Sequence, residues 1–365
     1  MSKTRKVVKW SIISITALIV SVICFGVWFM NLIPAPEIPK SVQKEITPSQ
    51  ISYLTDHQIP NRGKILAVVT SVEKIGNTEK NTGYELSELA RAYYVFQANG
   101  FDVIVASTVG GKAPMVIDKD DMRAYDYAFL NDSVAMNKVN NTIAIENVNP
   151  DAYQAIYFVG GKGAMFDFPK NKKIQHLVQN YYESGKVVGA VCHGPSALIN
   201  VTLSNGQPLL TGKEISAFTN EEELLLIPEA KEIFPFLLQD QLAAKGANFN
   251  KGIMYLNQVS LDGNLVTGQN PWSTWGVAEN MIRQMGYEPK YRKPSSEENT
   301  IGILKLYENR GYHKAKKKLD EYCKKDSWSV DRELLGIHAL LAAYQFRLAK
   351  STELTMLLSH SNKYL

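Results

Sequence analysis

The adjacent residues Cys192 and His193 are the part of this sequence best suited to nucleophilic chemistry. They lie in the stretch KVVGAVCHGPSAL (186–198), where β-forming and small residues give way to a helix-like pattern. A thiolate is a strong nucleophile, and a neighbouring imidazole can serve as its base. Gly194 removes a Cβ where a sharp turn is crowded, and Pro195 suits the first turn of a helix. The stretch predicts a reactive cysteine at a strand end, with its thiol pKa lowered by the following helix N-terminus.

The alternative for Cys192 is that it is a small buried core residue, which is the commonest fate of a lone cysteine. The sequence has three widely spaced cysteines and no CxxC pair; the other two are Cys24 and Cys323. This number and spacing argue against a disulfide framework and against a cysteine-rich zinc site. A reactive or a buried thiol therefore remains for Cys192, and we expect no metal at its site.

The composition of the chain indicates about two folded domains, or one large domain with appendages. Hydrophobic residues make up 45% of the 365 residues, which is enough to fill a sizeable core. The net charge is only +4, and the basic excess lies at the two ends of the chain. We therefore expect no nucleic-acid-binding surface.

The N-terminus combines a basic flank, residues 1–9, with a stretch at 10–33 that contains no charged side chain. A helix of that length would span a bilayer core of roughly 30 Å. The pattern predicts a single-pass transmembrane anchor, with the basic flank in the cytoplasm and the main domain outside it. The alternative is a cleaved signal peptide, which the long apolar run and the prolines beside Ala35 make less favourable. The Pro-rich, polar residues 34–61 then form a linker.

Residues 62–290 predict one α/β domain, because short apolar strands alternate with amphipathic helices. The expected strands are KILAVVTSV, FDVIVAS, YQAIYFVGG and KVVGAVC, followed by the shorter KEISAFT and GNLVTGQ. Continuous apolar strands are typical of a parallel sheet that is buried on both faces. The predicted fold is a doubly wound, mostly parallel sheet sandwiched by helices, of the flavodoxin-like type. Ligands bind at the carboxyl ends of such strands, which is where Cys192 would lie.

The C-terminal part of the chain has a different composition. After a linker at 291–298, residues 299–365 are Lys- and Leu-rich and show helical periodicity without strands. They predict an all-helical appendage, with Gly311 at a tight turn between two helices. We expect this region to pack on its own domain, on a second subunit or on a binding partner.

The stretch AVCHGPSAL resembles the cysteine elbow of the ThiJ/PfpI superfamily, whose members are relatives of the class I glutamine amidotransferases. Further stretches are similar to the branch that contains stress chaperones and glutathione-independent glyoxalases (glyoxalase III). They are TGYELSELARAYYVF, FVGGKGAMFDF, and GKEISAFTNEEE with LVTGQNP. The resemblance covers residues 62–288 and leaves out the N-terminal stretch and the C-terminal helices.

The resemblance implies a catalytic set built around the thiol. Cys192 would be the nucleophile and His193 its base, and Glu223 would be the acid that orients the histidine. Glu221 and Glu222 compete with Glu223, which we prefer because it lies five residues after the phenylalanine of FTNEEE. The alternative for all three glutamates is an ordinary solvated acidic helix start.

The resemblance also implies groups on two other segments. Glu88 would be the carboxyl beside the thiol, with Glu85 as its neighbouring alternative. A carboxyl with a raised pKa could stabilise the thiolate and move protons between adjacent substrate carbons. The amides of Gly160 and Gly161 would form an oxyanion hole together with the elbow at Gly194.

Lys162 departs from the pattern of this branch, which usually has a histidine here in a GGHG sequence. Lysine is a charged point donor whose ordinary pKa is too high for proton transfer near neutrality. We expect Lys162 to contact the substrate, and the change leaves the substrate preference open.

The function that the resemblance implies is conversion of methylglyoxal-type 2-oxoaldehydes into 2-hydroxy acids, without a metal or an organic cofactor. It also favours a homodimer. One alternative is a cysteine hydrolase that acts on amides or peptides. Another is a chaperone-like or redox-sensing stress protein in which Cys192 is oxidised rather than catalytic.

Overall fold

The computed structural model describes residues 3–35, 40–118 and 121–365 of the chain. The chain divides into two compact units: one is Lys40–Arg292, and the other joins Met1–Pro39 to Lys293–Leu365. The first unit contains all the described strands, and the described elements of the second are helical. Residues 1–2 of the predicted basic flank and 36–39 of the predicted linker lie outside the described part.

A seven-stranded sheet forms the centre of the first unit, in the order β10-β11-β7-β6-β1-β3-β5. Neighbouring strands are parallel except for β10 and β11, which pair antiparallel at one edge. The strands are β1 Gly63–Val69, β3 Phe101–Ser107, β5 Ile143–Ala144, β6 Ala155–Phe158, β7 Val187–Val191, β10 Val259–Asp262 and β11 Leu265–Gly268. Two short pairs lie outside this sheet: β2 Tyr84–Glu85 with β4 Met115–Val116, and β8 Glu214–Ile215 with β9 Asn248–Phe249.

Both faces of the sheet are buried. Along β1, Ile65, Ala67 and Val69 belong to one apolar core. Leu66 and Val68 belong to the core on the opposite face. Successive side chains of a strand point to opposite faces, so a strand covered on both sides can be apolar at every position.

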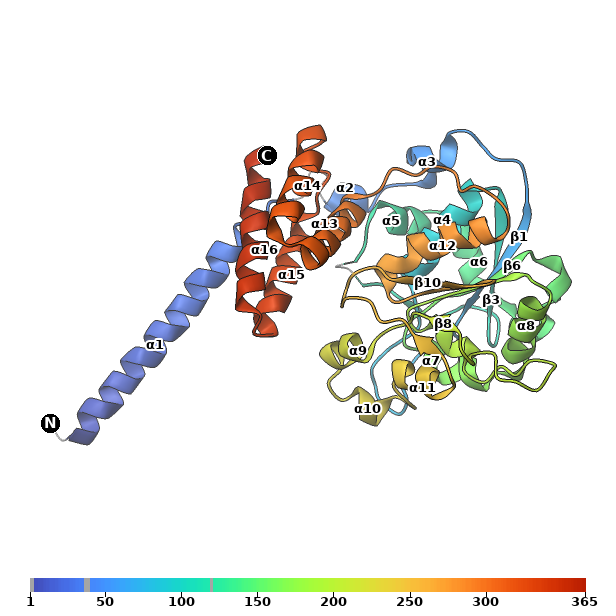
Figure 1. The fold of residues 1–365 in the computed structure, drawn as a ribbon, viewed down its shortest axis with the longest axis horizontal. Coiled ribbons are helices and arrows are strands. Elements are labelled where there is room, and N and C mark those ends of the chain that lie inside the picture. Colours follow the sequence, from blue (N-terminus) through green and yellow to red (C-terminus); the bar gives the residue numbers. More distant parts are fainter. Residues whose placement is uncertain (1–2, 36–39, 119–120) are drawn as a thin grey trace. The chain divides into compact units, whose positions relative to one another are not determined.

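Helices cover the two faces. α4, α5, α6 and α12 contribute to the first core, and α8 and α11 contribute to the second. Figure 1 shows α4 and α12 side by side on one face and α8 on the other. The helices of this unit are α2 Lys40–Gln43, α3 Ser52–Thr55, α4 Leu86–Ala98, α5 Ala124–Leu130, α6 Ser133–Asn140, α7 Ala164–Asp167, α8 Lys172–Glu183, α9 Asn220–Leu226, α10 Ala230–Ile233, α11 Leu238–Ala244 and α12 Thr274–Gln284. The mostly parallel, helix-covered sheet that the sequence predicts is therefore present.

The second unit consists of helices from both ends of the chain. They are α1 Lys3–Met30, α13 Ser296–Arg310, α14 Tyr312–Lys325, α15 Arg332–Tyr344 and α16 Leu348–Ser361. Gly311 joins α13 to α14 with φ of +75°, a conformation that favours glycine. The segment after α1 packs on the C-terminal helices, because Nδ2 of Asn362 donates to the carbonyl oxygen of Leu32 at 2.7 Å.

The predicted transmembrane anchor at residues 10–33 is contradicted by the structure. Helix α1 covers most of this stretch. Nevertheless, in the described part of the chain no helix has both the length and the apolar character that crossing a bilayer requires. The prediction relied on a stretch without charged side chains. Such a stretch can still be polar, because Ser11, Ser14 and Thr16 are uncharged but polar. The predicted single-pass membrane location rested on this stretch alone, and it is therefore also wrong.

Candidate active site

The turn after β7 places Cys192 at the carboxyl edge of the sheet. Its φ of +58° lies in the left-handed region, which is strained for a residue with a Cβ. The amide of Cys192 donates to the carbonyl oxygen of Gly268 on the adjacent β11 at 2.9 Å. A Cβ at Gly194 would lie 2.3 Å from the carbonyl oxygen of Phe158 on β6, so only glycine fits there. The neighbouring strands thus hold the cysteine in a sharp, strained turn, as in a nucleophile elbow.

The element after the elbow differs from the prediction. It is a 3-10 helix of five residues, Gly194–Leu198, with Pro195 in its first turn. So short a helix has little macrodipole, and the expected lowering of the thiol pKa is not realised. The pKa of the Cys192 thiol is instead raised well above its ordinary value, first by burial and then by the carboxyl of Glu88.

His193 bridges the thiol and a carboxyl group. Its Nδ1 lies 3.3 Å from Sγ of Cys192, and its Nε2 lies 2.6 Å from Oε2 of Glu223. All three side chains are buried. The amide of Phe218 donates to the carbonyl oxygen of Cys192 at 3.0 Å, which ties the segment leading to Glu223 to the elbow. A sulfur, an imidazole and a carboxyl group in this order can pass a proton from the thiol to the ring.

The structure distinguishes Glu223 from its two competitors. Glu221 forms an ion pair with Lys251 at 2.6 Å, and both side chains are exposed. Glu222 is completely buried, and its carboxylate accepts hydrogen bonds from five donors. These are the amide and Oγ1 of Thr219, the amide of Tyr255, Nε2 of Gln269 and Nδ2 of Asn270. Of the three glutamates, Glu223 alone has a hydrogen bond to His193 in the described contacts.

Glu88 approaches the thiol from the first turn of α4, where it is completely buried. The amide of Gly160 donates to Oε2 of Glu88 at 2.8 Å. A Cβ at Gly160 would lie 2.4 Å from that oxygen and 2.8 Å from Cβ of Cys192. The carboxyl and the cysteine therefore converge on one glycine. The hydroxyl of Tyr157 donates to the carbonyl oxygen of Glu88 at 2.9 Å and fixes this turn of α4 to β6.

The surroundings of Glu88 favour its protonated form. Burial raises the pKa of Glu88 well above its ordinary value, and the nearby carboxyl of Glu85 raises it further. A neutral carboxyl does not repel a thiolate at Cys192 and can donate a hydrogen bond to it. Once Glu88 holds its proton, its negative charge no longer raises the pKa of the Cys192 thiol, while the larger effect of burial remains.

The two glycines predicted to form an oxyanion hole are not equivalent. The amide of Gly160 is already used by Glu88. Gly161 has φ of +100°, and a Cβ there would lie 2.3 Å from the carbonyl oxygen of Gly83. Only glycine can make this close approach, so the turn that carries Lys162 depends on Gly161.

Glu85 and Lys162 lie at the same edge of the sheet as the thiol. Glu85 ends β2, directly before α4. Burial raises the pKa of Glu85 from 4.5 to about 7; the charge of Lys162 opposes this rise and that of Asp121 adds to it. Lys162 also lowers the pKa of Cys192. The ammonium group of Lys162 is therefore within electrostatic reach of both the thiol and Glu85.

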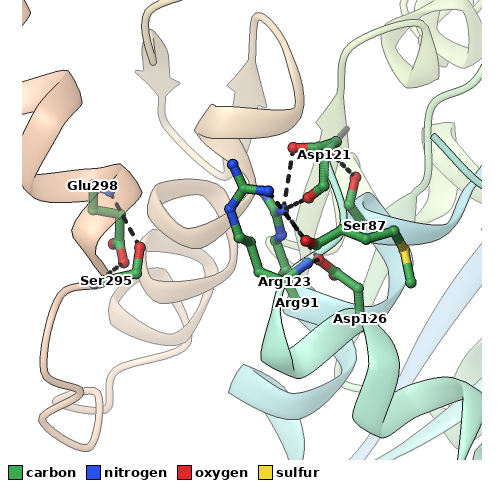
Figure 2. Close-up of polar contacts among 8 residues, drawn as sticks. Ser87, Arg91, Asp121, Arg123, Asp126, Ser295 and Glu298 are labelled. Atoms are coloured by element: carbon green, nitrogen blue, oxygen red, sulfur yellow. Dashed lines mark hydrogen bonds and ion pairs between the residues drawn. The ribbon is translucent and has the colours of Figure 1, made fainter. Parts of the chain in front are cut away.

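Polar contacts of Arg91 and Ser87 tie helix α4 to the 121–126 segment, as Figure 2 shows. Nη2 of Arg91 contacts Oδ1 of Asp121 at 3.2 Å and Oδ2 of Asp126 at 3.1 Å. Oγ of Ser87, next to Glu88 in the helix, donates to Oδ2 of Asp121 at 2.5 Å. The arginine and Asp126 are both almost inaccessible to solvent. Arg91 was not predicted from the sequence, although a charged residue among the apolar residues of TGYELSELARAYYVF was the available signal.

The carboxylate of Asp167 fixes the glycine-rich loop that follows β6. Oδ2 of Asp167 accepts from Oγ1 of Thr70 at 2.8 Å, the amide of Ser71 at 3.0 Å and Oγ1 of Thr108 at 2.7 Å. These donors follow the ends of β1 and β3. Asp167 thus joins the loop after β6 to the two neighbouring strands, and it makes no described contact with the thiol.

Comparison with known proteins places this geometry in a family. Residues 80–223 match the DJ-1/PfpI family. The glutathione-independent glyoxalase HSP31 of Saccharomyces cerevisiae is 32% identical over 230 residues, covering 60% of this chain and 96% of that protein. The chain belongs to the DJ-1/PfpI family. The resemblance predicted from the elbow and its companion stretches is confirmed.

Further proteins are similar to this chain over the same share of its length. Glyoxalase 3 of Candida albicans is 29% identical over 236 residues, covering 60% of this chain and 97% of that protein. The solved structure of glyoxalase III from Candida albicans has a TM-score of 0.56 at 26% identity, covering 61% of this chain and 97% of its own. The REP24 protein of Francisella tularensis has a TM-score of 0.58 at 34% identity, covering 61% and 99%. The relatives with glyoxalase names support the prediction that this family member is an enzyme.

Proposed function

We propose that this chain is a glutathione-independent glyoxalase, which converts a 2-oxoaldehyde such as methylglyoxal into the corresponding 2-hydroxy acid. The observation that carries the proposal is the convergence of the Cys192 thiol with His193 on one side and the buried Glu88 carboxyl on the other. The glyoxalase names of several relatives support the same activity.

The first step is addition of sulfur to the aldehyde carbon. The Cys192 thiol passes its proton to Nδ1 of His193, and Glu223 stabilises the imidazolium through Nε2. The sulfur then bonds to the aldehyde carbon, and the aldehyde oxygen takes up the proton. The product is a hemithioacetal bound to Cys192, with the ketone still intact.

The second step moves hydrogen between the two substrate carbons. With the carbon-bound proton removed from the former aldehyde carbon, an enediol forms, and a proton is then delivered to the former ketone carbon. Glu88, which is protonated at rest, first gives its proton to the ketone oxygen, and the resulting carboxylate accepts the carbon-bound proton to leave the enediol. The carboxyl then delivers that proton to the former ketone carbon and takes up the hydroxyl proton of the former aldehyde carbon, so it ends the step protonated. The former aldehyde carbon is oxidised to a thioester while the ketone is reduced to an alcohol, so no external oxidant is used.

The third step releases the product. Water adds to the thioester carbonyl, the carbon–sulfur bond breaks, and the sulfur regains a proton from His193. The net reaction consumes one water for each 2-oxoaldehyde and regenerates the free thiol.

The proposal is tested by incubating the full-length protein with methylglyoxal in the absence of glutathione and measuring lactate by NMR. We expect lactate to form, and Cys192→Ala to lower the rate by about a thousandfold or more. An amide and a peptide substrate are assayed in parallel. Peptide hydrolysis without lactate formation would favour a cysteine hydrolase and overturn the proposal.

A further inference from the structure

Lys162 is held firmly at the edge of the candidate site. It follows Gly160 and Gly161 after β6, which is the neighbour of β7 in the sheet. The amide of Met165 donates to the carbonyl oxygen of Lys162 at 3.2 Å, and the amide of Ala164 donates to that of Gly161 at 3.1 Å. These bonds fix the backbone of Lys162 two residues after Gly160, where a Cβ would lie 2.8 Å from Cβ of Cys192. The side chain of Lys162 is partly buried.

The ammonium group of Lys162 has no hydrogen-bond or ion-pair partner in the described part of the chain. Its charge nevertheless acts on both Cys192 and Glu85. Because no direct ion pair neutralises this partly buried cation, it can bind an anionic group of a ligand that reacts with Cys192.

We propose that Lys162 makes this site selective for 2-oxoaldehydes that carry a carboxylate at the end opposite the aldehyde. The inference rests on the proposed glyoxalase function and names its substrate class. With the sulfur of Cys192 on the aldehyde carbon, the ammonium of Lys162 would pair with the distant carboxylate.

The surrounding charges favour a monoanion over a phosphate dianion. Lys162 supplies one positive charge, whereas Glu85, Asp118 and Asp121 place carboxyl groups nearby. Arg91 is already paired with Asp121 and Asp126, so a second negative charge on the ligand would face Glu85 with Lys162 as the one unpaired cation of this described set. A carboxylate therefore fits the local charge better than a phosphate.

The chemistry with such a substrate balances as it does for methylglyoxal. 4,5-Dioxopentanoate adds its aldehyde carbon to the thiol, isomerises to a thioester and is released by one water as 2-hydroxyglutarate. The distant carboxylate takes no part in bond making and enters and leaves unchanged.

The first test uses alkylation of Cys192 by iodoacetate and by iodoacetamide, which are similar in size and differ by one negative charge. We divide the second-order rate constant for iodoacetate by that for iodoacetamide, in the wild-type protein and in Lys162→Met. Lys162→Arg and the exposed Lys170→Met are the controls. One unit charge near the sulfur is expected to raise the ratio at least about fivefold. The ratio should fall in Lys162→Met only; equal ratios in wild type and Lys162→Met would overturn the inference.

The pH dependence of the same ratio adds a second readout. The pKa of Glu85 is raised to about 7, so this carboxyl gains negative charge as the pH rises through that value. The groups that face it are Lys162, Asp118, Asp121, Glu88 and Cys192. We expect the ratio to fall between pH 6 and 8 in wild type and to change less in Glu85→Gln. Because both reagents need the thiolate, titration of the thiol cancels in the ratio.

Turnover separates this inference from the proposed function. We expect the ratio of kcat/KM for 4,5-dioxopentanoate to that for methylglyoxal to fall about tenfold in Lys162→Met, mainly through KM. If wild type converts both substrates and the ratio is the same in Lys162→Met, the inference fails and the glyoxalase function stands. If wild type converts neither, the proposed function fails, and the alkylation ratio still decides whether Lys162 recognises an anion.

Discussion

At the scale of single residues, the proposed chemistry depends on the Cys192 thiol and on the Glu88 carboxyl beside it. Cys192 is buried and has a raised pKa, so the resting site holds a thiol rather than a preformed thiolate. His193 at 3.3 Å is the nearest described base, and the protonated Glu88 is an acid beside the same sulfur. In the proposed reaction the nucleophile is therefore generated as substrate binds, with His193 as the base and Glu88 as the acid.

Replacing Glu88 tests its part in proton transfer. Gln is nearly isosteric and keeps an acceptor for the amide of Gly160, but it cannot accept and return a proton. We expect Glu88→Gln to lower kcat for lactate formation by about a hundredfold or more while Cys192 still reacts with iodoacetamide. Circular dichroism of the variant checks the fold. An unchanged kcat would assign the proton transfer to His193 alone.

The raised pKa of Glu85 predicts a pH-dependent stability. Its pKa rises from 4.5 to about 7 on folding, so the folded state binds the proton more tightly than the unfolded state. The stability that this proton contributes is complete below pH 4.5 and is lost as the pH rises through about 7. The free energy of unfolding of Glu85→Gln should therefore rise relative to wild type from pH 5 to 8, as urea denaturation would measure. A constant difference over this range would show that Glu85 titrates normally.

At the scale of elements, helix α9 positions the acid that orients His193. Thr219 caps this helix, and the carboxylate of Glu222 accepts hydrogen bonds from the amide and the hydroxyl of Thr219. It also accepts from the amide of Tyr255. The buried carboxylate of Glu222 thus fixes the start of the helix on which Glu223 follows directly. Glu222 is a positioning residue, since it makes no described contact with the imidazole.

Glu222→Gln should therefore lower both stability and activity. All five partners of the Glu222 carboxylate are hydrogen-bond donors. The amide nitrogen of a Gln is also a donor, so the partners that face it would lose their acceptor. We expect a loss of about 2–4 kcal/mol in the free energy of unfolding, because hydrogen bonds to a buried charge are lost. The matched control is Glu221→Gln next to it, whose exposed ion pair contributes at most about 1 kcal/mol. Equal effects of the two substitutions in urea denaturation would contradict this role.

The sequence identifies some of these elements and not others, for physical reasons. The apolar run before Cys192 and the Gly-Pro after it are local signals, and they place the elbow correctly. The spacing that favours Glu223 over its neighbours also agrees with the observed contact to His193. By contrast, Arg91 contacts Asp121 and Asp126, which lie 30 and 35 residues further along the chain. The helical spacing of apolar residues does not indicate such distant partners. The raised pKa of the thiol was also missed, because burial depends on packing from several segments.

At the scale of the whole molecule, the chain divides into two units, and each contains fully buried leucines. Leu66 lies in the core of the sheet, and Leu357 lies in the helical unit. The site residues Cys192, His193 and Glu223 all belong to the Lys40–Arg292 unit. The helical unit contributes no described side chain to the hydrogen bonds around the thiol.

Matched core substitutions test this separation. Both leucines are fully buried, so Leu66→Ala and Leu357→Ala should each remove about 2–5 kcal/mol of stability from their own unit. Hydrogen exchange followed by mass spectrometry should show faster exchange in the substituted unit only. We expect Leu357→Ala to keep the wild-type kcat/KM for methylglyoxal at temperatures where it remains folded. A loss of kcat/KM in that folded variant would show that the helical unit acts on the site.

The most direct test of the central claim is a single-turnover experiment with carbon-13-labelled methylglyoxal and the protein in excess, without glutathione. If Cys192 carries the reaction, the label appears in lactate in one phase whose rate constant stops rising once the substrate is fully bound. Cys192→Ala, at the same concentration, should form no lactate on that timescale. Equal lactate formation by wild type and Cys192→Ala, or none by wild type, would contradict the account.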